Sequence, residues 1–308
     1  MTTARKPPPP LFGRPRAEVE AELGEREPVR CPLCHLEPKR FATDPQGFHL
    51  ARCPGCRLEF QSPRPPFERL AEIVYAREYG DLADTAAEVT PEKRARYQRQ
   101  LDRMERFLGR RGSLLEVGCG AGAFLRLAAE RGWAIAGTDI QLSEGARQSG
   151  ARLWAGRLKE INFGGQRFST VRFHHALEHT ENPLAELERA RELLEPDGLL
   201  YVSVPNLAGL SPRLKSWQSR WRLKPRPWRH YAALHHLWYF TPESLNKLLE
   251  RAGFRLRHWE TPHVPKPGEA AWRAALYRRL FEKPRWGSIL DVYAQPHRTA
   301  NALRTRYA

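Results

Sequence analysis

The sequence has no long apolar run. Nowhere in its 308 residues does an apolar stretch approach the roughly 18 to 20 residues that a membrane-spanning helix needs, so we expect no transmembrane segment. The first residues, MTTARKPPPPLFGRPR, also lack the apolar core of a signal peptide, and we expect a cytoplasmic protein. An apolar content of 41% is too high for a mainly disordered chain and suffices for one large core with a small addition.

Cysteine is scarce, which argues against a disulfide framework. Four of the five cysteines form two CxxC pairs, Cys31 with Cys34 and Cys53 with Cys56. This spacing suits a metal site in a reducing compartment. Four thiolates on two short knuckles, separated by a hairpin turned at residues 44–47, can surround Zn²⁺ as a tetrahedron, and so small a unit needs the metal to fold. We therefore predict a structural zinc ribbon over residues 29–62.

Acidic residues are outnumbered by basic ones. The chain has 51 Lys and Arg against 35 Asp and Glu, a net charge of +16, which favours an anionic partner. A GC-rich genome that prefers Arg would produce the same excess without any functional demand. Charge alone therefore does not identify the partner.

The chain divides into five expected parts. In chain order they are a flexible arm with a PPPP run (1–28), the zinc ribbon (29–62), a linker and helical extension (63–110), an α/β domain (111–295) and a basic tail (296–308). In the extension, Thr90 and Pro91 suit the start of a helix. Apolar residues at helical spacing then predict that this helix continues to 109 and packs on the domain that follows.

The α/β domain is predicted from alternating strand and helix patterns. We expect strands at 114–117, 133–138, 151–155, 168–174, 199–204, 254–260 and 287–294. Helices are expected at 122–131, 143–149, 182–194 and 241–252. Such alternation implies a Rossmann-like, mostly parallel seven-stranded sheet covered on both faces, with ligands at the carboxyl ends of its strands.

A glycine-rich turn follows the first of these strands, in LLEVGCGAGAFL. Gly118, Gly120 and Ala123 match the dinucleotide fingerprint, and Asp139 lies where a ribose-binding acid is expected. Glu116 decides between two cofactors, because its carboxylate would repel a pyrophosphate but attract the ammonium of S-adenosylmethionine. The turn therefore favours S-adenosylmethionine.

These motifs together resemble a known family. LLEVGCGAGAFL, GTDI, FHHALEH, LLEPDGLLYVSVPN and HHLWYFTPESLNKLLERAGF are similar to the successive motifs of class I S-adenosylmethionine-dependent methyltransferases of the ubiquinone-biosynthesis-like group. CPLC and CPGCRLEFQSPRP resemble a bacterial branch of that group with an N-terminal zinc ribbon. The resemblance covers roughly residues 30–295. One departure is Ser169, where the family usually has Asp.

The resemblance implies a set of cofactor-binding residues. Glu116 would meet the methionine ammonium, the turn at 118–122 would wrap the cofactor, and Asp139 would hold the ribose. The full implied set is Glu116, Gly118, Cys119, Gly120, Gly122, Asp139, Ile140, Gly156, Arg157 and His174. In this set Ile140 would flank the adenine, and Cys119 is expected to be buried beside the cofactor rather than to bind metal.

Histidines supply the candidate catalytic groups. A hydroxyl acceptor must lose its proton, and histidine suits that task near neutral pH. The candidates for this base are His175, His179 and His236, with His235 adjoining. For His179 and His236 the alternative is a structural role, in ordering the loop or shaping the pocket.

The stretch 207–240 is the main candidate for the acceptor site. It has seven Lys and Arg, no acidic residue and several tryptophans. We expect it to stand over the active site as a basic lid, because Arg pairs with phosphate or carboxylate and aromatic faces stack on sugars or bases. The candidate substrate contacts are Arg222, Arg226, Trp228 and Tyr239. The alternative is an amphipathic segment that rests on the protein or on a membrane surface.

Together these features predict a class I methyltransferase that methylates an oxygen, or a carbon, of a polar, anionic small molecule such as a sugar or nucleotide sugar. One alternative is a zinc-ribbon RNA methyltransferase, which the positive charge and the tryptophans would also suit. Another is a non-catalytic adaptor that binds S-adenosylmethionine without turnover.

Overall fold

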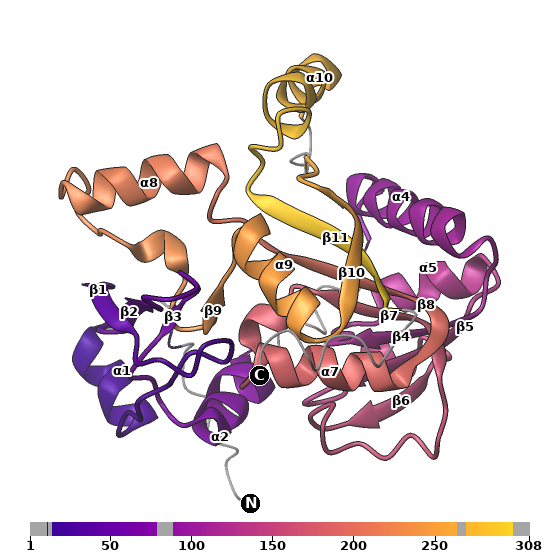
Figure 1. The fold of residues 1–308 in the computed structure, drawn as a ribbon, viewed down its shortest axis with the longest axis horizontal. Helices are drawn as coiled ribbons and strands as arrows, with labels where there is room; N and C mark the ends of the chain where they lie inside the picture. Colours follow the sequence, from indigo (N-terminus) through magenta and orange to yellow (C-terminus); the bar gives the residue numbers. More distant parts are fainter. Residues whose placement is uncertain (1–10, 12–13, 79–88, 264–268, 298–308) are drawn as a thin grey trace, which may run out of the picture.

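Two β-sheets organise the chain. The computed structural model describes residues 11, 14–78, 89–263 and 269–297 (Figure 1). A seven-stranded sheet has the order β10-β11-β8-β7-β4-β5-β6, and a four-stranded sheet has the order β1-β2-β3-β9. Among the described residues, no helix is both long enough and apolar enough to cross a membrane.

The large sheet confirms the predicted α/β architecture. Its strands are β4 (Ser113–Val117), β5 (Ala134–Asp139), β6 (Arg152–Ala155), β7 (Phe168–His174), β8 (Leu194–Pro205), β10 (Phe254–Glu260) and β11 (Ile289–Pro296). The five strands from β4 to β8 are parallel, and β11 runs antiparallel between β8 and β10. All seven expected strands are present, although β8 begins five residues earlier than expected.

Helices cover both faces of this sheet. The helical elements are α1 (Arg16–Leu23), α2 (Phe67–Leu70), η1 (Ala71–Glu78), α4 (Pro91–Leu108), α5 (Ala123–Glu130), α6 (Glu144–Arg147), η2 (Leu177–His179), α7 (Pro183–Leu193), α8 (Leu210–Arg220), η3 (Arg229–Tyr231), α9 (Pro242–Arg251), α10 (Ala271–Tyr277) and η4 (Arg278–Glu282). Leu114 packs in a cluster with α4 and α5, whereas the next residue, Leu115, packs in a cluster with α7 and α9. Successive strand residues thus serve opposite faces.

The sequence encodes the ends of α4 locally. The Thr90 hydroxyl accepts a hydrogen bond from the Lys93 amide, Pro91 occupies the first turn, and Gly109 ends the helix with a left-handed φ of 70°. These are the residue types that cap helices well. The helix therefore forms where the sequence predicts it.

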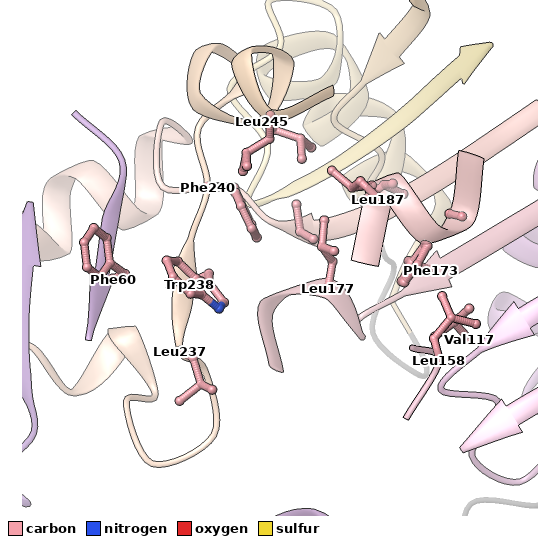
Figure 2. Close-up of a cluster of buried hydrophobic side chains, with 14 of the residues drawn as sticks. Phe60, Val117, Leu158, Phe173, Leu177, Leu187, Leu237, Trp238, Phe240 and Leu245 are labelled. Carbon is pink, nitrogen blue, oxygen red and sulfur yellow. The ribbon is translucent and has the colours of Figure 1, made fainter. Parts of the chain in front are cut away.

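The ribbon shares its sheet with the α/β domain. Strands β1 (Lys39–Thr43), β2 (His49–Arg52) and β3 (Glu59–Gln61) form an antiparallel meander, and β9 (Trp238–Tyr239) pairs with β3. Figure 2 shows Phe60 of β3 near Trp238 of β9, with Phe240, Leu177 and Phe173 continuing toward the large sheet. One core cluster contains all of these side chains. The ribbon is therefore packed onto the α/β domain.

Part of the expected flexible arm packs against the rest of the chain. Helix α1 buries Val19 and Leu23, and Leu11 is buried in the same cluster. The spacing of Val19 and Leu23 places both on one helical face, although the charged residues around them obscure this apolar pair in the sequence. Residues 1–10 and 12–13 lie outside the described part, as does the basic tail from 298 onward.

Candidate active site

The glycine turn after β4 has the backbone geometry that its sequence requires. Gly118, Gly120 and Gly122 have φ values of 72°, 52° and 67°, a region that other residues rarely adopt. A Cβ on Gly118 would lie 2.9 Å from the Cβ of Ala176, so close approach also demands glycine there. The turn then leads directly into α5.

A cavity of about 370 Å³ lies at the carboxyl ends of β4, β5 and β7. This is where an α/β sheet binds its ligands, and the volume falls in the range of roughly 300–1,000 Å³ typical of small-molecule sites. Nine of the ten predicted cofactor-binding residues line it: Glu116, Gly118, Cys119, Gly120, Asp139, Ile140, Gly156, Arg157 and His174. Gly122 instead packs against Ala146 and Ser149, beneath the turn.

Glu116 has one oxygen paired and one oxygen without a partner. Its Oε1 accepts a hydrogen bond from Arg172, which is fully buried on the neighbouring strand at the register position of Glu116. Its Oε2 is buried and has no hydrogen-bond partner among the described residues. Burial raises the pKa of Glu116 to about 7, although the Arg172 charge opposes this shift. A buried carboxylate oxygen in the cavity wall fits the ammonium of S-adenosylmethionine.

Arg172 is a site residue that the sequence analysis missed. Its Nη2 donates to the Gln100 side-chain oxygen at 2.8 Å, and its guanidinium lies 3.6 Å from the centroid of the Phe124 ring. A single Arg within the apolar strand FSTVRFH, directly across from Glu116, was the available signal. The arginine holds the Glu116 carboxylate without itself lining the cavity.

Asp139 is held at the end of β5 by two backbone amides. Its Oδ2 accepts from Gly120 at 2.8 Å and its Oδ1 accepts from Ile140 at 2.8 Å. Burial raises the pKa of this carboxyl group, while the amide hydrogen bonds oppose the shift. Because a carboxylate has about four acceptor positions, it retains acceptor capacity for two ribose hydroxyls.

His175 and Glu178 form a hydrogen-bonded pair beside the cavity. The Nδ1 atom of His175 lies 3.2 Å from Glu178 Oε1, and His175 has a left-handed φ of 53°. The imidazole is partly exposed and lines the cavity, whereas Glu178 is fully buried. Burial alone would raise the pKa of Glu178, but the hydrogen bond to His175 and the nearby His179 lower it to about 2. Glu178 is therefore ionised at neutral pH and can stabilise an imidazolium.

His179 and His236 are arranged differently from His175. His179 lines the cavity, and its Nδ1 lies 2.7 Å from the His235 carbonyl oxygen. His236 does not line the cavity; its ring centroid lies 5.0 Å from that of His179. Burial lowers the pKa of His179 and lowers that of His236 to about 3. Both geometries match the structural alternative, in which these rings order the loop.

The segment 207–240 does not cover the cavity, so that expectation is wrong. All of its residues are described, and none lines the cavity. Arg222 and Arg226 are exposed beyond α8, which Figure 1 shows above the ribbon strands. Trp228 packs on Phe41 of the ribbon at 5.6 Å between ring centroids, and Tyr239 is buried in β9. Trp228 and Tyr239 therefore pack with the ribbon and do not reach the cavity.

The helical extension supplies a wall of the cavity instead. Phe67, Tyr75, Lys93 and Tyr97, from α2, η1 and α4, all line it. Arg157 of the α/β domain forms an ion pair with the extension, because its Nη1 lies 3.2 Å from Oε1 of Glu68. The same Nη1 lies 3.3 Å from Oε2 of Glu181, within the domain. No motif marked these residues, because each reaches the cavity only through the packing of its helix.

The four cysteines of the two CxxC motifs, Cys31, Cys34, Cys53 and Cys56, lie close together in the ribbon. Their sulfur atoms all lie within 4.8 Å of one another. The two knuckles are equivalent, since the amide of His35 donates to Cys31 O at 2.9 Å and the amide of Arg57 donates to Cys53 O at 3.1 Å. Four sulfur donors on two matching turns fit a tetrahedral zinc site.

Comparison with known proteins agrees with this site. A family model described as "Methyltransferase domain" matches residues 91–258. The ubiquinone biosynthesis O-methyltransferase of Dinoroseobacter shibae is 30% identical over 181 residues, which cover 54% of this chain and 68% of that protein. A protein of the same name from Cereibacter sphaeroides is 31% identical over 179 residues, again 54% of this chain and 68% of that protein.

A solved structure shares the fold. It is the 1,6-didemethyltoxoflavin-N1-methyltransferase of Burkholderia thailandensis, determined with 1,6-didemethyltoxoflavin and S-adenosylhomocysteine bound. The TM-score is 0.52 at 19% sequence identity, and the match covers 84% of this chain and 99% of that one. At this identity the likeness concerns the fold alone.

Proposed function

This chain belongs to the methyltransferase-domain family and is a class I S-adenosylmethionine-dependent methyltransferase, and from that premise we propose that it methylates a hydroxyl oxygen of a small molecule with His175 as the general base. The observation that carries this proposal is the pair of His175 and Glu178, in which a buried, ionised carboxylate orients an imidazole at the cavity wall. A base that is held in this way suits an acceptor that must lose a proton. The relatives from Dinoroseobacter and Cereibacter are named O-methyltransferases, which supports an oxygen acceptor.

The donor would bind at the turn. Glu116 Oε2 would accept a hydrogen bond from the methionine ammonium, and Asp139 would accept the ribose hydroxyls. Gly156 and Arg157 would border the adenine. When bound, S-adenosylmethionine supplies an electrophilic methyl group on a sulfonium. This chain's residues align the two reactants, and alignment alone can supply a large part of the acceleration.

His175 would accept the proton that the acceptor hydroxyl loses. The imidazole removes the hydroxyl proton as the oxygen attacks, and Glu178 stabilises the resulting imidazolium. The imidazole returns the proton to solvent through its partly exposed edge.

The acceptor is proposed to be a hydroxylated ring that carries an anionic group. Phe67, Tyr75 and Tyr97 offer aromatic faces in the cavity wall. Lys93 lines the same cavity, with its Nζ 5.8 Å from the centroid of the Tyr97 ring, and is a suitable partner for a carboxylate or phosphate. Lys93 thus takes the role first expected of Arg222 and Arg226.

The ribbon is proposed to hold a structural Zn²⁺ through Cys31, Cys34, Cys53 and Cys56. Reduced thiols are required for this, as in the cytoplasm, where we expect the protein to act. The ion would fix the ribbon against β9.

The proposal is tested by methyl transfer from tritiated S-adenosylmethionine to hydroxybenzoates and a nucleotide sugar. His175→Gln should lower kcat about 100-fold or more, since a general base supplies roughly 10²–10⁴, while S-adenosylhomocysteine affinity stays unchanged. Lys93→Met should raise KM for the anionic acceptors alone. If the His175→Gln variant kept the wild-type kcat, His175 would not be the general base. Intact S-adenosylhomocysteine binding without turnover of any acceptor would instead favour the RNA or adaptor alternatives.

A further inference from the structure

Large exposed apolar side chains are concentrated on two helical segments. The described part of the chain exposes eleven large hydrophobic residues, and nine of them lie in 210–223 or 272–286. The first segment is α8 with the turn after it, and the second is α10 with η4 and the turn after that. Exposed apolar residues that are scattered singly over a surface are normal, whereas exposed apolar residues that gather in one region indicate an interaction site.

On α8 these side chains form one stripe. Leu210, Leu214, Trp217 and Trp221 follow one another at intervals of four, three and four residues, which places them on one helical face. Trp217 and Trp221 are 54% and 64% exposed. The stripe therefore faces outward and has no partner among the described residues that would bury it.

A second stripe runs along α10 and η4. Trp272, Leu276 and Leu280 are spaced by four residues and are exposed, Trp272 by 64%. Trp286, the last residue of this segment, is also exposed. Both stripes thus combine leucine with tryptophan.

The two segments arise from a shared base. Residues 206–210 leave β8 beside residues 286–288, which lead into β11. The Asn206 amide donates to the Ser288 carbonyl at 2.9 Å, and the Leu210 amide donates to the Trp286 carbonyl at 2.9 Å. Figure 1 shows α8 and α10 projecting from the upper part of the molecule. Both segments therefore leave the large sheet at the same point.

Both segments are strongly basic. Residues 210–223 contain four Lys and Arg and no acidic residue, and residues 272–286 contain five Lys and Arg with Glu282 as the one acidic residue. Leucine and tryptophan stripes flanked by cations are typical of helices that lie in the interface of an anionic bilayer, where each nearby cation contributes about 1 kcal/mol.

We propose that residues 210–223 and 272–286 together bind an anionic membrane surface, with the two apolar stripes entering the headgroup region and the cations contacting lipid phosphates. A second copy of the chain fits this surface poorly, because a twofold interface would set the same cations opposite one another. RNA fits it less well, because leucines share the stripes with the tryptophans and aliphatic side chains provide no stacking surface for bases.

The test is sedimentation of the full-length protein with vesicles of phosphatidylcholine, with and without about 30% phosphatidylglycerol. The wild type should bind the anionic vesicles at least about tenfold more strongly than the neutral ones. Trp217→Ser with Trp221→Ser, and separately Trp272→Ser with Leu276→Ser, should each weaken this binding about tenfold. Leu36→Ser is the matched control, because Leu36 is exposed at 46% outside the two segments.

Charge variants and two competing ligands complete the test. Arg220→Glu with Arg222→Glu should weaken binding to anionic vesicles, whereas Arg255→Glu with Arg257→Glu, on β10, should not. All variants should keep wild-type affinity for S-adenosylhomocysteine. Equal binding to both vesicle types, or to neither, overturns the proposal. Vesicle-independent binding of single-stranded RNA, or self-association that is lost in the tryptophan variants, assigns the surface to those partners instead and overturns it as well.

Discussion

The indole Nε1 of Trp238 donates a hydrogen bond to the carbonyl oxygen of Thr180 at 2.7 Å. Trp238 lies on β9, paired with Phe60 of the ribbon, and Thr180 lines the cavity. In addition, the Leu237 backbone amide donates a hydrogen bond to the Glu178 carbonyl oxygen at 2.8 Å. The ribbon is therefore connected through β9 to the loop that carries the proposed base.

Disrupting the zinc centre should disturb the active site as well as the ribbon. We expect Cys53→Ser to abolish zinc binding and to lower the melting temperature by about 5 °C, which corresponds to about 3 kcal/mol for a chain of this size. Methyl transfer should fall with it, because β9 no longer holds residues 178–180. Zinc analysis and calorimetry measure both effects. Cys119→Ser, which alters the unpaired cysteine, should retain one zinc per chain; zinc loss there would contradict the four-cysteine assignment.

Glu116→Gln should weaken S-adenosylhomocysteine binding about 10- to 100-fold. The expected loss follows from one charge-assisted hydrogen bond of about 1.5–3 kcal/mol. The same change leaves the Arg172 charge buried without its carboxylate, which should also lower stability by about 3–5 kcal/mol. Adding Arg172→Met should restore much of the stability but none of the affinity. Titration calorimetry and thermal unfolding separate the two effects, and affinity regained in the double variant would show that Glu116 acts only through Arg172.

Binding of S-adenosylhomocysteine should also depend on pH. Burial raises the pKa of Glu116 from its usual 4.5 to about 7, so the carboxyl group is mostly protonated at pH 6 and mostly ionised at pH 8. Only the ionised form attracts the ammonium, so affinity should rise up to about tenfold across this interval. In Glu116→Gln the rise should vanish. A flat profile in the wild type would mean that Arg172 keeps Glu116 ionised throughout.

Much of this site could be predicted from the sequence because it depends on backbone geometry and strand ends. Glu116 and Asp139 lie at the carboxyl ends of two strands and Gly118 and Gly120 follow the first of them, and the structure places all four at the cavity as expected. Lys93, Phe67 and Tyr75 could not be found in this way, because they reach the cavity from elements that are distant in the chain. Trp228 and Tyr239 were misassigned because aromatic residues in core and in ligand sites look alike in sequence.

Glu178→Gln should separate an orienting role from a structural one. We expect kcat to fall about 10- to 100-fold, part of the roughly 10²–10⁴ that a general base supplies. The KM of the acceptor should stay unchanged, because the ionised Glu178 acts on the imidazolium that forms during proton transfer and not on acceptor binding. A purely structural role of Glu178 would lower the melting temperature and leave the kcat of the folded enzyme unchanged. S-adenosylhomocysteine affinity serves as the control and should stay unchanged.

Gly118→Ala and Gly120→Ala should differ even though both residues have positive φ. Any side chain at either position incurs about 1 kcal/mol or more of backbone strain. At Gly118 the new Cβ also meets Ala176 at 2.9 Å, whereas at Gly120 no atom lies within 4 Å. Gly118→Ala should therefore displace the segment that leads to His175 and Glu178, and should lower both stability and kcat beyond the effect of Gly120→Ala. Thermal unfolding and steady-state kinetics on the matched pair measure the difference, and equal losses in the two variants would show that backbone strain alone accounts for the glycines of this turn.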